Sequence, residues 1–156
     1  MAEGECCPRL NEADWDKKEM EWRGKPFYRT KYWSIFHMPL NIGGVTTKAM
    51  AELDSKGLVE DPTLMLSREE SMFSSTLLLS MNQDTDDPKV ERLSGNYVSR
   101  LFQGSYRDTS KWIKETMQYC EETGREAREL LFWYVTCPKC AEKYGGAQTV
   151  IFAKVD

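Results

Sequence analysis

Residues 130–140 read LLFWYVTCPKC, in which three consecutive aromatic residues are followed by a Cys-x-x-Cys pair. The spacing of Cys137 and Cys140 is typical of zinc sites and of redox motifs. A structural zinc ion needs four ligands, and the adjacent residues Cys6 and Cys7 would chelate one tetrahedral ion awkwardly. A redox pair belongs at a strand-to-helix junction of a βαβ unit, whereas this pair follows a late strand in a charged turn. We therefore expect free thiols, with no bound metal and no cofactor.

The aromatic residues of the same stretch fall on both faces of an expected strand, because side chains alternate along a strand. One face holds Leu131, Trp133 and Val135, and the other holds Leu130, Phe132, Tyr134 and Thr136. The first face is uniformly apolar and suits a helix-covered core. We assign the second face to a ligand cleft, where Phe132 forms a wall and the hydroxyl of either Tyr134 or Tyr106 would polarise a substrate carbonyl.

Aromatic residues elsewhere in the chain are expected to complete this cleft. Alternation along residues 31–38 puts Tyr32 and Phe36 on the face opposite Trp33 and His37, and we assign the Tyr32 face to the cleft. The full set of expected ligand-binding residues is Tyr32, Phe36, Phe73, Phe102, Tyr106, Trp112 and Phe132. Flat ligands stack between such rings, each contact contributing about 1 kcal/mol beyond burial. The alternative is that these are ordinary core residues.

Glu69 is the expected proton-handling group. Strand alternation separates Leu64 and Leu66, on a core face, from Met65, Ser67 and Glu69, on a cleft face. There, Glu69 would act as a general base or orient an attacking water molecule. The alternative is that Glu69 and Glu70 are solvated turn residues. The single histidine, His37, is expected to be structural.

The charge and hydrophobicity of the chain limit the kinds of molecule that it is expected to bind. The chain has 156 residues and a net charge of −4, with no basic block, so a nucleic acid partner is not expected. No apolar stretch reaches the roughly 18 residues that a membrane span needs. The N-terminus lacks the apolar core of a signal peptide. We expect a cytoplasmic protein whose partner is a flat aromatic small molecule.

The order of expected elements is the same in both halves of the chain. A strand at 25–39, a helix at 41–57 and strands at 62–70 and 74–81 are followed by a polar loop. A strand region at 90–108, a helix at 109–124 capped by Asp108 or Thr109, and strands at 128–135 and 147–155 repeat that order. The fold class predicted is α+β, with two pseudo-symmetric β-α-β-β units, an antiparallel sheet, helices on one face and a ligand cleft between the units. Residues 1–25 would be an N-terminal arm, and 26–156 one domain of two repeats, about 26–83 and 88–156.

Two segments carry a resemblance to a known family: YVSRLFQGSYRDTSKWIKETMQYC and FWYVTCPKCAEKYGGAQTVIFAKV. Together with the element order over residues 26–156, they resemble GyrI-like small-molecule-binding domains. Tyr134 matches a tyrosine of the family's closing strand, and Pro138 lies four residues beyond it, as in the family. Phe132 stands where the family has a glutamate that commonly meets cationic drugs. No helix-turn-helix precedes the domain, so the chain looks like a stand-alone member.

The resemblance implies an activity as well as a fold. Some stand-alone GyrI-like proteins are hydrolases that open the cyclopropane ring of flat DNA-alkylating natural products of the yatakemycin and duocarmycin type, using an aromatic cage. On this resemblance we expect a cyclopropanoid cyclohydrolase that serves in xenobiotic detoxification, with Glu69 and Tyr134 as catalytic residues. The alternatives are a drug-binding or sequestering protein without turnover, and a metal-stabilised interaction protein.

Overall fold

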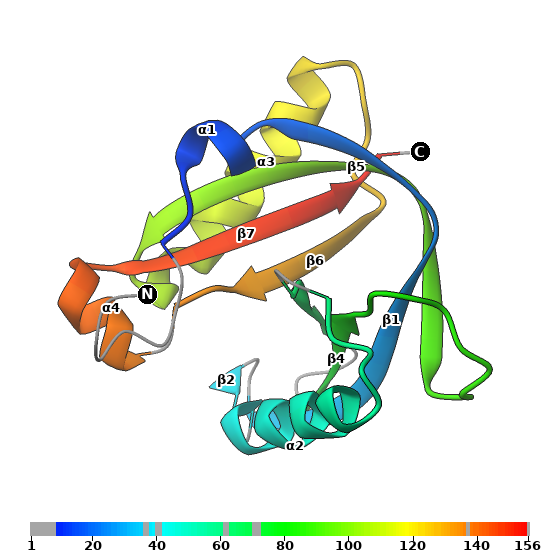
Figure 1. The fold of residues 1–156 in the computed structure, drawn as a ribbon. Coiled ribbons are helices and arrows are strands. Elements are labelled where there is room, and N and C mark those ends of the chain that lie inside the picture. The colour runs from blue at the N-terminus through cyan, green and yellow to red at the C-terminus, as the bar shows by residue number, and fades with distance from the viewer. Residues whose placement is uncertain are drawn as a thin grey trace. The chain divides into compact units, whose positions relative to one another are not determined.

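A computed structural model describes residues 9–35, 38–39, 42–60, 63–69, 73–136 and 138–155 of the chain. The elements in chain order are α1 (Glu12–Trp15), β1 (Lys18–Ile35), β2 (Met38–Pro39), α2 (Ile42–Ser55), β3 (Met65–Glu69), β4 (Ser74–Ser80), β5 (Val90–Gly104), the 3-10 helix η1 (Tyr106–Asp108), α3 (Thr109–Glu122), β6 (Glu129–Tyr134), α4 (Pro138–Tyr144) and β7 (Ala147–Lys154) (Figure 1). The chain divides into two compact units, Trp22–Ser94 and Met1–Glu21 with Gly95–Asp156.

The unit Trp22–Ser94 is an antiparallel sheet covered by α2. β4 pairs with β1 from Phe27↔Ser80 to Trp33↔Ser74, and with β3 from Met65↔Leu79 to Glu69↔Ser75. One face of this sheet packs against the apolar stripe of α2 in a single core cluster. The cluster contains Tyr28, Tyr32, Ala49, Leu53, Leu58, Leu77, Leu79, Met81 and Val90. The core of this unit therefore lies between α2 and the sheet.

The other unit is a three-stranded antiparallel sheet in the order β5–β7–β6, with a helix on each face. β7 pairs with β5 from Tyr97↔Lys154 to Gly104↔Ala147, and with β6 from Glu129↔Lys154 to Tyr134↔Thr149. α3 packs on the face that carries Phe102 and Phe132. On the opposite face, Trp15 of α1 makes edge contacts with Trp133 at 5.1 Å and with Phe152 at 6.4 Å between ring centroids.

These observations confirm the α+β class, the antiparallel pairing and the order of strands and helices, but they correct two expectations. The face of β6 that carries Phe132 and Tyr134 was expected to be open, yet it is the face that α3 covers. The segment after β6 was expected to be a turn, yet α4 begins at Pro138. Proline is favoured at the first helical position, and a two-turn helix is too short to show a clear hydrophobic period.

The helix α4 changes the setting of the Cys-x-x-Cys pair. Cys140 is a buried residue of α4, whereas Cys137 lies outside the described residues. Cys140 therefore lies just after the strand-to-helix junction of β6 and α4, rather than in a turn. The strands on either side, β6 and β7, are antiparallel, so the junction is not part of the βαβ unit that a thioredoxin-like motif requires.

Candidate ligand-binding site

Four of the aromatic residues singled out in the sequence meet on the α3 face of the β5–β7–β6 sheet. Phe102 comes from β5, Trp112 from α3, and Phe132 and Tyr134 from β6. Ile151 of β7 forms the floor between them. The residues converge because strand alternation puts every second side chain on this face and because Trp112 lies on the buried stripe of α3.

The rings of this aromatic cluster are arranged as two parallel pairs. Phe102 and Trp112 stack with centroids 5.5 Å apart and planes inclined by 11°. Phe132 and Tyr134 stack at 6.1 Å and 7°. Gly104, at the end of β5, has a φ of 154°, which favours glycine, and a Cβ there would be in ordinary contact with Cζ2 of Trp112 at 3.4 Å. Parallel rings of this kind are the surfaces on which a flat ligand stacks.

Thr149 of β7 is a polar residue inside this apolar setting. It stands opposite both Phe102 and Tyr134 in the sheet register, so its side chain shares their face. The residue is fully buried, and its Oγ1 atom has no hydrogen-bond partner among the described residues. Buried hydroxyls are nearly always hydrogen-bonded, so an unsatisfied one calls for an explanation. Thr149 could not be selected from sequence, because a threonine in an apolar strand is common.

Arg100 fixes a positive charge beside the cluster. Its guanidinium carbon lies 5.1 Å from the centroid of the Phe102 ring and 5.2 Å from that of Tyr119. Its Nε atom donates to the Asp16 carboxylate at 2.8 Å, and Asp16 also accepts from the backbone of Leu101. The charge of Arg100 is thus paired within this unit.

Asp108 is a carboxylate that the sequence suggested only as a helix cap. It does occupy the N-cap position of α3, but its side chain makes no capping hydrogen bond. The same hypothetical Cβ at Gly104 that would contact Trp112 would lie 3.6 Å from Oδ2 of Asp108. Asp108 is therefore an exposed acidic group at the edge of the aromatic cluster.

The remaining predicted residues do not join this cluster in the structure. Tyr32 belongs to the core cluster of the unit Trp22–Ser94, beneath α2. Phe73 precedes β4 and is 54% exposed. Phe36 lies outside the described residues, as do the side chains of Tyr106, in η1, and Glu69, at the end of β3. The roles expected for these residues stay predictions.

Met65 and Ser67 of β3, which were expected to line the cleft, are packed instead. Met65, two strand positions before Ser67, packs against the core cluster beneath α2. Ser67 stands opposite Leu77, is buried, and has no partner for its Oγ atom. The Met65 face is therefore packed under α2, and Leu66 on the opposite face is buried as well.

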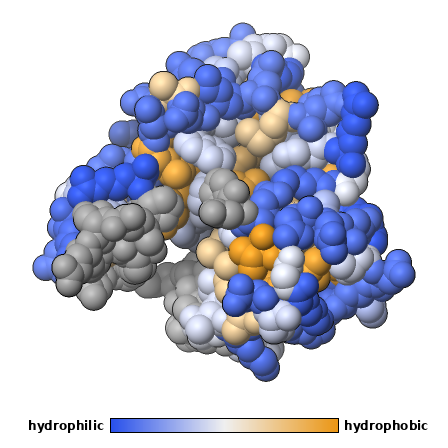
Figure 2. Space-filling model, viewed as in Figure 1, coloured by the Kyte–Doolittle hydropathy of each residue, from blue (hydrophilic) through white to orange (hydrophobic). Residues whose placement is uncertain are grey.

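Clusters of metal-ligating residues and long apolar helices are both absent from the described parts of the chain. There, no group of three or more histidine, cysteine, aspartate or glutamate residues is arranged to hold a metal ion. Cys6, Cys7 and Cys137 fall outside those parts, so the absence of zinc stays a prediction. No described helix is long and apolar enough to cross a membrane. Seen as in Figure 1, the surface is mostly hydrophilic, with small hydrophobic patches (Figure 2).

Comparison with known proteins defines the family. The model of the family described as bacterial hydrolase matches residues 1–155, so the chain belongs to that family. No protein of curated function matches the sequence.

Solved structures share the fold at low identity. The crystal structure of the EcmrR C-terminal domain has a TM-score of 0.69 at 12% identity and covers 91% of this chain and 98% of that chain. A hydrolase from Listeria innocua gives 0.61 at 14% identity, covering 90% and 92%. SAV2435 bound to tetraphenylphosphonium gives 0.51 at 13% identity, covering 90% and 94%. These matches fit the resemblance to GyrI-like domains.

Proposed function

We propose that the aromatic cluster of β5, β6, β7 and α3 binds flat, neutral aromatic small molecules, and that the protein hydrolyses a strained electrophile held there. The observation that carries the proposal is the buried Thr149 hydroxyl, which faces two parallel ring pairs and has no partner. A ligand carbonyl seated among the rings would accept its hydrogen bond. Membership of the bacterial hydrolase family supports the hydrolytic part.

The comparisons support binding of a small molecule by this fold. SAV2435, with a similar fold, was solved with tetraphenylphosphonium, and the similar protein from Listeria innocua is described as a hydrolase. The present cluster differs in charge from a site for cations. Phe132 stands where GyrI-like domains have a glutamate, and Arg100 lies beside Phe102. A neutral ligand is therefore preferred, because a cation buried here would lose its hydration and find no counter-charge to replace it.

The proposed reaction is addition of water to a cyclopropane fused to a dienone, the reactive unit of yatakemycin-type compounds. The water oxygen bonds to a cyclopropane carbon as the strained C–C bond breaks. The released electron pair moves into the dienone and gives a phenolate, which takes up a proton and becomes a phenol. Hydroxyl donors at the carbonyl oxygen, Thr149 and Tyr134, would stabilise the developing charge.

A carboxylate would take the proton from the attacking water. Glu69 is the base expected from the sequence, and general-base assistance is typically worth about 10²–10⁴-fold. Asp108 is the second candidate, because it lies at the edge of the cluster beside Trp112. Binding without turnover is the alternative function. It is favoured by the position of Asp108, which is exposed at the edge of the cluster.

Two measurements test the proposal. Titration with 9-fluorenone, a flat neutral ketone, should quench tryptophan fluorescence, and a Trp112→Phe variant should lose most of that quenching. Incubation with a yatakemycin-type cyclopropanoid should yield a product heavier by one water, detected by mass spectrometry. Quenching without any hydrated product would identify a binding protein, and the absence of both would refute the proposed site.

A further inference from the structure

A cavity lies wholly within the unit Trp22–Ser94, beneath the C-terminal end of α2. Its volume is about 230 Å³. Four apolar side chains line it: Leu53, Leu58, Met81 and Val90. An apolar cavity of about 150 Å³ is large enough to hold benzene. This cavity therefore has room for one aromatic ring and a short polar substituent.

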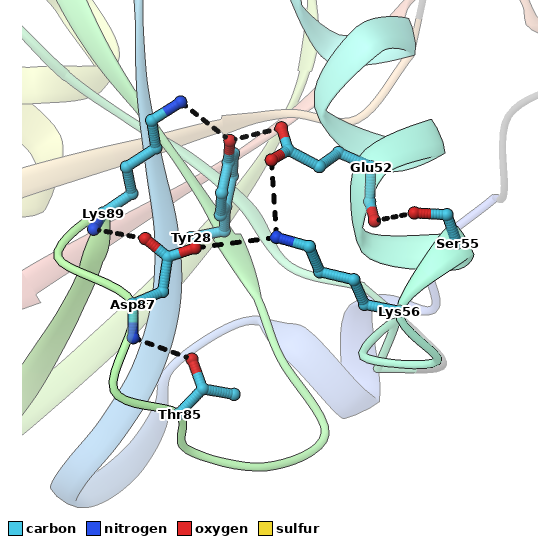
Figure 3. Close-up of polar contacts among 7 residues, drawn as sticks. All are labelled: Tyr28, Glu52, Ser55, Lys56, Thr85, Asp87 and Lys89. Carbon is cyan, nitrogen blue, oxygen red and sulfur yellow. Dashed lines mark hydrogen bonds and ion pairs between the residues drawn. The ribbon is translucent and has the colours of Figure 1, made fainter.

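Polar groups from three segments line the cavity or contact the residues that line it (Figure 3). Tyr28 projects from β1, Glu52 and Lys56 come from the end of α2 and the turn after it, and Asp87 and Lys89 come from the loop before β5. The loop is fixed locally, since Asp87 Oδ1 accepts from the Lys89 backbone at 2.8 Å. These residues are distant in sequence and meet only through the fold.

In each of the carboxylates of Glu52 and Asp87, one oxygen accepts a short hydrogen bond and the other has only a distant cation. Glu52 Oε2 accepts from the Tyr28 hydroxyl at 2.6 Å, and Asp87 Oδ1 accepts from the Lys89 backbone. The second oxygens, Glu52 Oε1 and Asp87 Oδ2, share the ammonium of Lys56 at 3.5 Å and 3.7 Å. Charge-assisted hydrogen bonds are normally about 2.7–2.9 Å long. The ammonium thus lies between two acceptors and engages neither closely.

The protonation states suit a cationic guest. Burial, together with the bond to Glu52, raises the pKa of Tyr28 to about 12, so at neutral pH its hydroxyl keeps its proton and donates. The bond from Tyr28 in turn lowers the pKa of the Glu52 carboxyl, so Glu52 is charged. Lys56 is half exposed, at 47%, and sits on a flexible stem that can turn to solvent.

We propose that this cavity binds a small primary amine carrying one apolar ring, whose ammonium takes the place of the Lys56 ammonium between Glu52 and Asp87. The ring fills the space lined by Leu53, Leu58, Met81 and Val90. Lys56 is then an internal stand-in for the ligand's charge. The site is independent of the aromatic cluster proposed above, because all of its residues belong to the unit Trp22–Ser94.

The test is a titration of the isotopically labelled protein with benzylamine, followed by amide shifts in NMR spectra. We expect a dissociation constant of about 1 mM, as for a fragment of this size, with shifts at Leu58 and Val90. Benzyl alcohol and benzoate, which carry the same ring without the ammonium, should bind at least about tenfold more weakly. This comparison needs no variant, so it stands even if a substitution impairs folding.

Variants then assign the charges. Lys56→Met removes the competing ammonium and should tighten benzylamine binding several-fold, whereas Asp87→Asn should weaken it about tenfold. Lys114→Met and Asp54→Asn, exposed positions outside the cavity lining, are the matched controls and should change nothing. Tighter binding of benzoate than of benzylamine, abolished by Lys56→Met, would make this an anion site and overturn the proposal. An absence of shifts at the cavity residues would also overturn it.

Discussion

Replacing Thr149 by valine separates the stability of the protein from its proposed function. The substitution removes a buried hydroxyl that has no partner and keeps the branched shape of the side chain. Leaving a buried polar group unsatisfied costs about 1–3 kcal/mol. The variant should therefore be more stable than the wild type by up to that amount. For a chain of this length each kcal/mol corresponds to about 2–4 °C in melting temperature.

The same substitution should weaken binding of a ligand that accepts the hydrogen bond. A neutral hydrogen bond contributes about 0.5–1.5 kcal/mol, so the affinity for 9-fluorenone should fall about two- to tenfold. Fluorene has the same ring system without the carbonyl, and its affinity should not fall. Fluorescence titration of both compounds against both proteins measures the difference directly.

Ser67→Ala is the matched control for this experiment. Ser67 is the other buried residue whose hydroxyl has no partner in the described part of the chain, and it lies in the unit Trp22–Ser94. Its removal should stabilise the fold without altering the ratio of fluorenone to fluorene affinity. If Thr149→Val destabilises the protein, or if both ligands lose affinity equally, the hydroxyl has a structural role and the reasoning fails.

Three further perturbations follow from the structure. The pKa of Tyr28 is raised to about 12 from an ordinary value near 10, so the contribution of Tyr28 to stability is fully present below pH 10 and is lost as pH rises toward 12. The free energy of unfolding, measured with urea at a series of pH values, should fall by about 2–3 kcal/mol over this range, and Tyr28→Phe should abolish the fall. Trp15→Ala should destabilise the protein by about 2–4 kcal/mol, read by denaturant unfolding, because it uncovers Trp133 and Phe152. Glu69→Gln should lower the turnover rate of the cyclopropanoid by about 10²–10⁴-fold with affinity nearly unchanged. If Glu69→Gln instead turns over at the wild-type rate and Asp108→Asn loses activity, the general base is Asp108.

Local sequence signals were sufficient for most of the fold. The helix α2 was expected at 41–57 and found at Ile42–Ser55, ahead of Gly57, whose φ of 67° suits a residue after a helix end. The strand pairs β3–β4 and β6–β7 were expected as neighbours and are antiparallel. These elements are long or strongly patterned, so their identity depends little on the rest of the molecule. The helices that were not expected, α1 and α4, have four and seven residues and obtain their helicity from their setting.

Strand alternation predicted which residues share a face, but it could not predict what covers that face. Both faces of β6 are apolar, because α3 packs on the side of Phe132 and α1 packs on the side of Trp133. When a strand is buried on both sides, its two faces are equally apolar, so the sequence cannot show which face lines a cleft. Phe132 and Tyr134 do lie beside Trp112, but the face that carries them is packed against α3 rather than open.

Local sequence patterns could not identify polar residues whose surroundings are set by strand register or by a loop. Thr149 becomes notable only because the pairing of β7 places it between Phe102 and Tyr134. The carboxylates of Glu52 and Asp87 are 35 positions apart in the numbering of the chain, and they approach the same ammonium only in the folded state. Neither arrangement has a spacing that a sequence pattern could reveal.

The two proposed sites should discriminate ligands by charge in opposite senses. In the aromatic cluster the nearby cation, Arg100, is already paired with Asp16, and the described members of the cluster supply no anion. A cation that entered would give up its hydration without a counter-charge, so neutral ligands are favoured. Beneath α2, two carboxylate oxygens face a loosely held ammonium, so a ligand ammonium replaces one cation by another at little electrostatic cost. Fluorenone and benzylamine should therefore bind without competing, each perturbing the residues of one unit alone.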